Sequence, residues 1–85
     1  MNDKHNPKKE VEIFRRNLRY LMFRSDLSLR DMEKVVGINR QSLNTYLHGE
    51  ARIPLAEAWI LSKYFQRGLE EMMTVDIHDK EVSRR

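Results

Sequence analysis

Residues 28–49, SLRDMEKVVGINRQSLNTYLHG, decide the fold of this chain because they predict two short helices joined by a tight turn. Ser28 can cap the first helix, and Asp31 three residues later completes the Ser-x-x-Asp pattern of a capping box. Apolar residues then recur at helical spacing. Gly37 follows them and suits the left-handed conformation that commonly ends a helix.

A second helix is predicted directly after this turn. Asn39 is a good N-cap and Gly49 a good terminator, so we expect the helix to cover residues 40–48. One face of it is apolar and consists of Leu43, Tyr46 and Leu47. The opposite face carries only side chains that can donate hydrogen bonds, and none of them is acidic: Arg40, Gln41, Ser42, Asn44 and Thr45.

This pair of helices resembles the helix-turn-helix of the lambda-repressor-like (Cro-type, xenobiotic-response-element) family of small DNA-binding proteins. The resemblance covers residues 14–73 and lies in the joint spacing of the following residues: Leu18, Leu21, Leu27, Ser28, Met32, Gly37, Ile38, Leu43, Gly49, Pro54, and Leu69 to Met72. It implies an all-α, compact five-helix domain that binds double-stranded DNA without a cofactor.

Three departures from the family pattern concern how the helices pack and dock. Leu29 replaces a usual glutamine that bonds a phosphate, and Glu33 replaces a usual alanine at the point where the two helices touch. We expect the Glu33 carboxylate to turn toward solvent or toward a cation such as Arg40. Met22 and Leu47 stand where many members have a buried Arg–Glu pair, and we expect them to touch. An apolar pair in place of a buried ion pair is often neutral or stabilising.

Length and composition indicate one domain without disulfides or thiolate metal sites, because the chain has 85 residues and no cysteine. The net charge of +3 suits a nucleic-acid partner without demanding one. No apolar run approaches the roughly 18 residues of a membrane span, and the N-terminus lacks the apolar segment of a signal peptide. We therefore expect no membrane partner and a cytoplasmic protein, bacterial or phage-encoded.

The chain is predicted to divide into three parts. Residues 1–6 should be a flexible arm, residues 7–73 the DNA-binding domain, and residues 74–85 a charged tail that frays unless a partner orders it. The buried stripe of the first helix should be Val11, Phe14, Leu18, Leu21 and Met22. That of the fourth helix should be Leu55, Ala58, Trp59, Ser62 and Phe65, with Trp59 as a core residue.

Basic residues are concentrated at the beginning of the domain. Lys8 and Lys9 fall in the first turn of the long helix, where the helix dipole favours acidic residues. They either contact phosphates or form an ordinary solvated end. The same choice applies to the four arginines of this helix, for which a solvated face is the commoner outcome: Arg15, Arg16, Arg19 and Arg24.

The resemblance implies that the second motif helix enters the major groove N-terminus first. Arg40 suits guanine O6 and N7, and Gln41 suits adenine N6 and N7. Thr45 could meet a thymine methyl, and Asn44 a base at the edge of the site. Phosphate contacts are expected from Ser28, Arg30, Ser42, His48 and Arg52. Alternatively, this polar face is merely solvated and His48 is an exposed helix end.

A single module of this size touches about one half-site, so we expect a homodimer that reads an inverted repeat. The predicted interface is formed by apolar residues outside the core stripe: Ile60, Tyr64, Val75 and Ile77. Alternatively, Ile60 and Tyr64 merely widen that stripe. The favoured function is a Cro-like or phage-type repressor of a palindromic operator. The alternatives are an antitoxin-type autoregulator, with a toxin or antirepressor as partner, and a helical protein-interaction module with weakened DNA binding.

The sequence does not favour an enzyme, because it combines no nucleophile with a base and has no glycine-rich phosphate loop. Ser28 is explained as a helix cap, and the three histidines lie far apart. Asp76, His78 and Asp79 could contact a metal, but such a group on a charged tail is more often coincidental. We expect no catalytic residue, no cofactor and no metal site.

Overall fold

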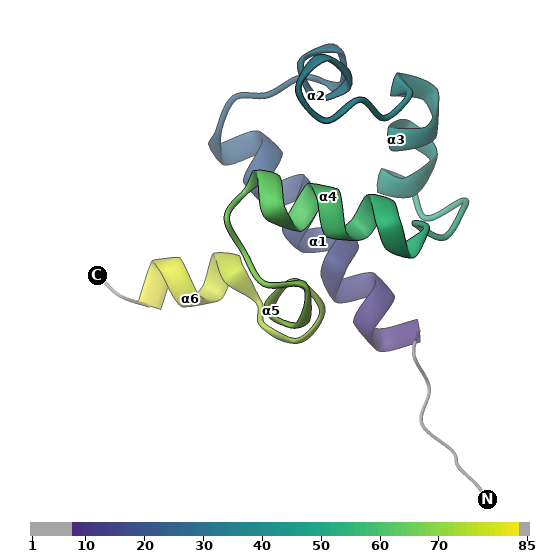
Figure 1. The fold of residues 1–85 in the computed structure, drawn as a ribbon. Helices are drawn as coiled ribbons and strands as arrows, with labels where there is room; N and C mark the ends of the chain where they lie inside the picture. The colour runs from purple at the N-terminus through teal and green to yellow at the C-terminus, as the bar shows by residue number, and fades with distance from the viewer. Residues whose placement is uncertain (1–7, 84–85) are drawn as a thin grey trace, which may run out of the picture.

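The computed structural model describes residues 8–83, and within them the chain forms six α-helices and no strand (Figure 1). This confirms the all-α class. The predicted arm of residues 1–6 lies outside the described residues. The helices are α1 (Lys8–Arg24), α2 (Leu29–Val36), α3 (Arg40–Leu47), α4 (Leu55–Tyr64), α5 (Leu69–Thr74) and α6 (Ile77–Ser83).

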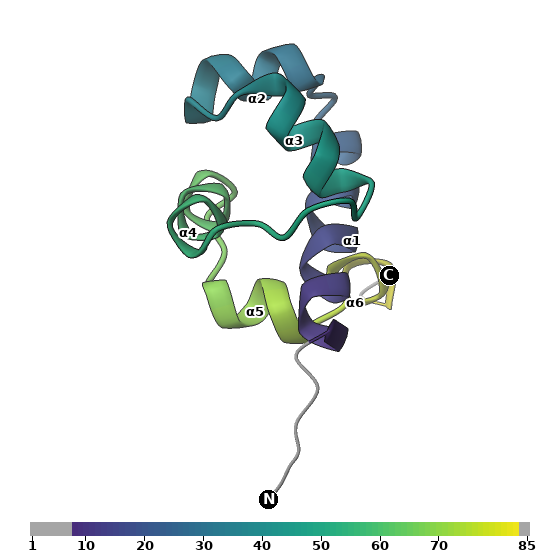
Figure 2. The same cartoon turned by 90° about the vertical axis from the view of Figure 1, so that its right-hand side faces the viewer.

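The long helix α1 is the element on which the others assemble. It packs against α3, α5 and α6, while α2 contacts α3 and α4, and α4 contacts α5. Figures 1 and 2 show α2 and α3 on one side of α1, α5 and α6 on another, and α4 between α2 and α5. The core that these helices enclose consists of Phe14, Leu18, Leu21, Met22, Met32, Ile38, Leu43, Tyr46, Ala58, Leu61, Met72 and Ile77.

The predicted core stripe of α1 is confirmed except at its first member. Val11 is exposed and lines an open groove beside the connection between α3 and α4. The stripe therefore begins at Phe14, where α1 becomes covered by its neighbours.

The orientation of α4 differs from the prediction. Trp59 is 54% exposed and Leu55 74% exposed, whereas Leu61, which was not predicted to be buried, is fully buried. The predicted burial of the small residues Ala58 and Ser62 is confirmed. Apolar residues of α4 point in most directions around its axis, so periodicity alone does not decide which side faces the core. The side that carries Ala58, Leu61 and Ser62 lies inward, and the side that carries Leu55 and Trp59 faces outward.

The segment predicted to be a frayed tail contains α6, which gives six helices instead of five. The buried side chain of Asn17 in α1 holds this helix in place. Its amide nitrogen donates to the carbonyl oxygens of Met72 (2.8 Å) and Val75 (2.7 Å). Its oxygen accepts a hydrogen bond from the backbone N–H of Ile77 (3.1 Å), whose side chain is fully buried. Ile77 is thus a core residue, and its predicted place in a dimer interface is wrong.

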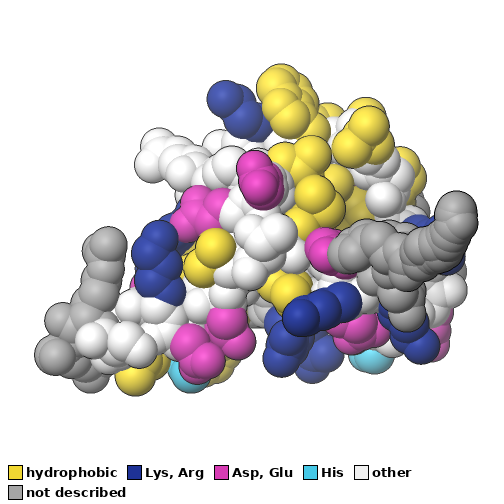
Figure 3. All heavy atoms as spheres, turned by 90° about the horizontal axis from the view of Figure 1, so that it is seen from below, with side chains coloured by type: hydrophobic (Ala, Val, Ile, Leu, Met, Phe, Trp, Pro, Cys, Tyr) yellow, Lys and Arg dark blue, Asp and Glu magenta, His cyan; other side chains and the backbone are white. Residues whose placement is uncertain are grey.

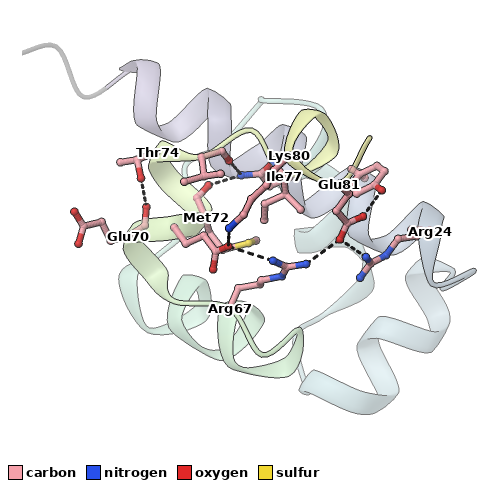
Figure 4. Close-up of polar contacts among 12 residues, drawn as sticks. Arg24, Arg67, Glu70, Met72, Thr74, Ile77, Lys80 and Glu81 are labelled. Carbon is pink, nitrogen blue, oxygen red and sulfur yellow. Dashed lines mark hydrogen bonds and ion pairs between the residues drawn. The ribbon is translucent and has the colours of Figure 1, made fainter. Parts of the chain in front are cut away.

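Charged side chains complete the attachment of α6 (Figure 4). The Glu81 carboxylate accepts hydrogen bonds from the Tyr20 hydroxyl and from the Arg24 and Arg67 guanidinium groups. Arg67 also pairs with Glu71 at 3.1 Å. The hydrogen bond from Tyr20, assisted by the two arginines, holds the pKa of Glu81 below its usual value.

Candidate nucleic-acid interface

The first helix of the predicted motif begins and ends as its sequence indicates. The Ser28 hydroxyl accepts a hydrogen bond from the Asp31 N–H (3.1 Å), and the Asp31 carboxylate accepts one from the Ser28 N–H (3.0 Å). This confirms the capping box and lowers the pKa of Asp31, chiefly through the bond from the Ser28 backbone. Gly37 ends the helix with φ of 76°, the left-handed conformation that favours glycine.

The second helix is fixed at its beginning by Asn39, as predicted. The Asn39 side-chain oxygen accepts hydrogen bonds from the N–H groups of Gln41 (2.8 Å) and Ser42 (3.3 Å). The inner face of α3 is anchored by the buried side chains of Leu43 and Tyr46. The Tyr46 hydroxyl donates to the Glu57 carboxylate of α4, which raises the pKa of Tyr46.

The outer face of α3 remains available to a partner. Arg40, Gln41 and Asn44 are exposed, and Thr45 is half-buried. The Thr45 hydroxyl donates to the Gln41 carbonyl oxygen (2.6 Å). Because this hydroxyl is already bonded to the backbone, the Thr45 methyl group is the better candidate for contact with a base. The four predicted base-contact residues thus share one short, capped helix.

A family model described as helix-turn-helix matches residues 18–72, which is well over half of the chain. The chain belongs to the lambda-repressor-like helix-turn-helix family. It is accordingly a DNA-binding transcription regulator. We call α3, the second helix of the motif, the recognition helix. No curated protein and no solved structure matches the chain significantly. None of the helices in residues 8–83 has the length and apolar character needed to cross a membrane.

The family's small residue at position 33 is replaced without disturbing the motif. Glu33 extends toward the beginning of the recognition helix, where its carboxylate lies 3.4 Å from Nε of Arg40. This confirms that the Glu33 carboxylate turns toward Arg40. Both side chains are substantially exposed, so the pair adds little stability.

Met22 and Leu47, which replace the family's buried ion pair, both belong to the apolar interior. Met22 is buried, and the partly buried Leu47 packs against the same core. Their mutual contact stays a prediction.

The predicted phosphate-contact residues are distributed over α2, α3 and the connection from α3 to α4. Ser28 caps α2 and Arg30 lies in the first turn of that helix, while Ser42 is in the first turn of α3. His48 is the C-cap of α3, with its Nδ1 atom 2.8 Å from the Asn44 carbonyl oxygen, and Arg52 is exposed in the following connection. Ser42 thus lies at the beginning of α3, and His48 and Arg52 follow its end, whereas Ser28 and Arg30 belong to α2.

The sequence did not indicate that Arg19 of α1 meets the end of the recognition helix. Its Nη1 atom donates to the Leu47 carbonyl oxygen at 3.5 Å. The last turn of α3 has no basic residue of its own, so Arg19 supplies the positive charge that a helix C-terminus favours. Helical spacing alone could not reveal this contact, because it joins residues in two different helices.

Asp76, His78 and Asp79 do lie close together, with potential ligand atoms within 4.8 Å of one another. All three are exposed. Asp76 has a structural role, because its carboxylate accepts a hydrogen bond from the Asp79 N–H (3.1 Å) at the beginning of α6. The proximity of these groups therefore follows from the helix start.

Proposed function

We propose that the protein is a Cro-like or phage-type repressor that binds a palindromic operator as a homodimer in the cytoplasm of a bacterium. The observation that carries this proposal is the exposed, non-acidic outer face of the recognition helix. Arg40 and Gln41 stand in its first turn, where a major-groove helix presents its base-reading residues. Asn44 and the Thr45 methyl group extend this surface by one turn.

The dimer is supported by an exposed apolar face on α4. Leu55, Trp59, Ile60 and Tyr64 lie there, and Lys63 places its Nζ atom 5.8 Å from the centre of the Trp59 ring. Figure 3 shows hydrophobic side chains gathered at the upper edge of the molecule. This edge is the side that faces the viewer in Figure 1, where α4 lies in front of α1. Large exposed apolar patches commonly mark protein interfaces. Ile60 and Tyr64 thus remain candidates, now joined by Leu55 and Trp59, while Val75 is partly buried.

The position of this face fits a two-fold arrangement on DNA. In Figure 2 the recognition helix faces the viewer and α4 lies at the edge of the molecule. A second copy paired through that edge would present its recognition helix on the same side. Two such helices would read half-sites about 34 Å apart, one turn of DNA.

Base readout is tested with the operator selected from a pool of random duplexes. Gln41→Ala should weaken binding to this operator by about 1–3 kcal/mol and relax the preference at one base position. Binding to random DNA should change much less. An equal loss on operator and random DNA would show that Gln41 does not read sequence.

Dimerisation is tested by analytical ultracentrifugation with Ile60→Glu. Val82→Glu is the matched control, because Val82 is also an exposed aliphatic residue but lies on α6. We expect Ile60→Glu to dissociate the dimer and the control to preserve it. A wild type that is monomeric at micromolar concentration and binds one half-site as tightly as the full repeat would refute the homodimer. That result would favour a toxin or antirepressor as the occupant of α4, as in the antitoxin alternative.

The interaction-module alternative makes a different prediction. Leu29 and Glu33 would then mark a DNA surface that has lost its function. Such a module need not bind random DNA in a salt-dependent manner, whereas a DNA-binding repressor must do so. Absence of this binding at low salt would refute the repressor proposal as a whole.

A further inference from the structure

A groove of about 640 Å³ lies beside the recognition helix, between the first turns of α1 and the connection from α3 to α4. Lys8, Val11, Glu12 and Arg15 form its α1 side. Tyr46 and residues 49–53 form the other side, including Arg52. The groove is therefore lined by three basic side chains and two acidic ones, Glu12 and Glu50.

Basic residues of α1 lie on the face of the helix that is turned toward this connection. Lys8, Glu12, Arg15 and Arg19 are spaced four, three and four residues apart, which places them on one face of the helix. Arg19 reaches the carbonyl at the end of α3, and Arg15 lines the groove that begins there. Three of the four residues on this face are positively charged.

Arg15 is held in place against the backbone of the connection. A Cβ atom added to Gly49 would lie 3.0 Å from Cζ of Arg15 and 3.2 Å from both Nε and Nη2. The guanidinium group thus lies directly against Gly49, whose φ of 75° also favours glycine. The Arg15 side chain is only 16% exposed and pairs with Glu12, which is 46% exposed. The cation is therefore positioned before any ligand arrives.

We propose that this groove binds a phosphate of the DNA backbone, with Arg15 as the main contact and Lys8 and Arg52 on the two sides. The inference rests on the proposed DNA-binding function and extends the DNA surface onto a segment that the family match does not include, since that match begins at residue 18. Figure 2 shows α3, its connection to α4 and the first turns of α1 on the side that faces the viewer. A duplex held by α3 can thus continue toward the groove.

The charges support an exchange of partners at Arg15. The Glu12 side chain is half-exposed, so its carboxylate can turn to water when DNA reaches Arg15. A guanidinium–phosphate contact can be bidentate, and it also releases counterions from the DNA. Glu12 therefore acts as a competitor that occupies Arg15 in the free protein and is displaced by DNA.

The test measures the affinity for a random-sequence duplex at salt concentrations from about 50 to 200 mM, by fluorescence anisotropy. Arg15→Gln should remove one phosphate contact and reduce the slope of log K against log salt by about 0.9. Over this fourfold range of salt, the total change in affinity should thus be about 3.5-fold smaller than in the wild type. Arg16→Gln is the control, because it removes the same charge from the neighbouring exposed residue. Arg15→Lys should keep most of the slope, and thermal melting verifies that each variant is folded.

The variant Glu12→Gln provides a second, independent test of the exchange at Arg15. It should strengthen binding to the duplex in the wild-type background, and this gain should disappear when Arg15 is also Gln. Glu70→Gln, an exposed acidic residue on α5, controls for the change in net charge. A gain that persists in the double variant would mean that Glu12 acts through the overall charge, and it would overturn the proposed exchange.

The groove inference and the proposed function fail in different ways. A wild type that binds duplex DNA with a salt-dependent affinity, combined with an unchanged slope for Arg15→Gln, would overturn only the groove inference. Equal reductions for Arg15→Gln and Arg16→Gln would do the same. A wild type without salt-dependent binding would overturn the proposed function itself, and the groove inference with it.

Discussion

Replacing Asn17 with alanine tests how the C-terminal helix α6 is held to the rest of the molecule. The Asn17 side chain is only 2% exposed, and it makes three hydrogen bonds, to Met72, Val75 and Ile77. A buried hydrogen bond contributes about 1 kcal/mol net, so the three together amount to about 3 kcal/mol. Water can reach some of the released backbone groups if α6 detaches. We therefore expect the free energy of unfolding to fall by about 2–4 kcal/mol.

For a domain of this size, each kcal/mol corresponds to a decrease in melting temperature of about 4–8 °C. Urea denaturation and thermal melting measure the effect, and hydrogen exchange locates it at the amides of α6. Asn17→Asp is the control for shape, because it keeps the acceptor for the Ile77 N–H but turns the donor into an oxygen that faces two carbonyls. At neutral pH it should destabilise at least as much as alanine, and less in acid, where the carboxyl group can donate. A loss below about 0.5 kcal/mol for Asn17→Ala, or unchanged exchange in α6, would refute the reasoning.

Three further predictions concern charge and backbone conformation. The pKa of Glu81 is lowered in the folded protein, so its contribution to stability is present above its ordinary value of 4.5 and is lost as the pH falls through the folded pKa. Urea midpoints should thus separate the wild type from Glu81→Gln at pH 7 and converge in acid, and a difference independent of pH would contradict this. Glu33→Ala should preserve or raise the melting temperature, because it removes only an exposed ion pair; a large decrease would show that Glu33 is a structural partner. Gly37→Ala should cost about 1–2 kcal/mol from the positive φ alone, since no atom lies within 4 Å of an added Cβ, and unchanged melting would argue against this strain.

The helix-turn-helix could be predicted from the sequence because its determinants are local. The Ser28–Asp31 capping box, the positive φ of Gly37 and the Asn39 cap each depend on residues within about one helical turn. The Glu33–Arg40 pair spans only the turn between α2 and α3. Such short-range geometry is nearly the same wherever the pattern occurs, and so the residues of the motif predict it.

The position of α4 could not be predicted in the same way. Its apolar residues occupy more than one side of the helix, and the side that is buried carries Ala58, Leu61 and Ser62. A tryptophan is more often buried than exposed, and this general tendency gave the wrong prediction for Trp59. The exposure of Trp59 bears on function, because a large apolar side chain outside a well-formed core is a candidate for contact with another molecule.

The attachment of α6 depends on contacts that no local pattern contains. Asn17 bonds to residues 55 to 60 positions away, and Tyr20 and Arg24 meet Glu81 across a similar distance in sequence. A polar residue between the apolar positions of an amphipathic helix is normally taken to be solvated. Asn17 is instead buried because α5 ends and α6 begins beside it. The backbone groups at these two helix ends need hydrogen-bond partners.

The arginines of α1 differ in role although they are close in sequence, because their partners lie in distant parts of the chain. Arg15 and Arg19 lie toward the recognition helix and its connection to α4, whereas Arg24 lies toward α6. One helix thus supports the DNA-binding motif on one side and binds the C-terminal helix on the other. Because α1 is shared, the bonds from Asn17 and Glu81 stabilise the helix on which the recognition helix rests, even though α6 lies outside the family match.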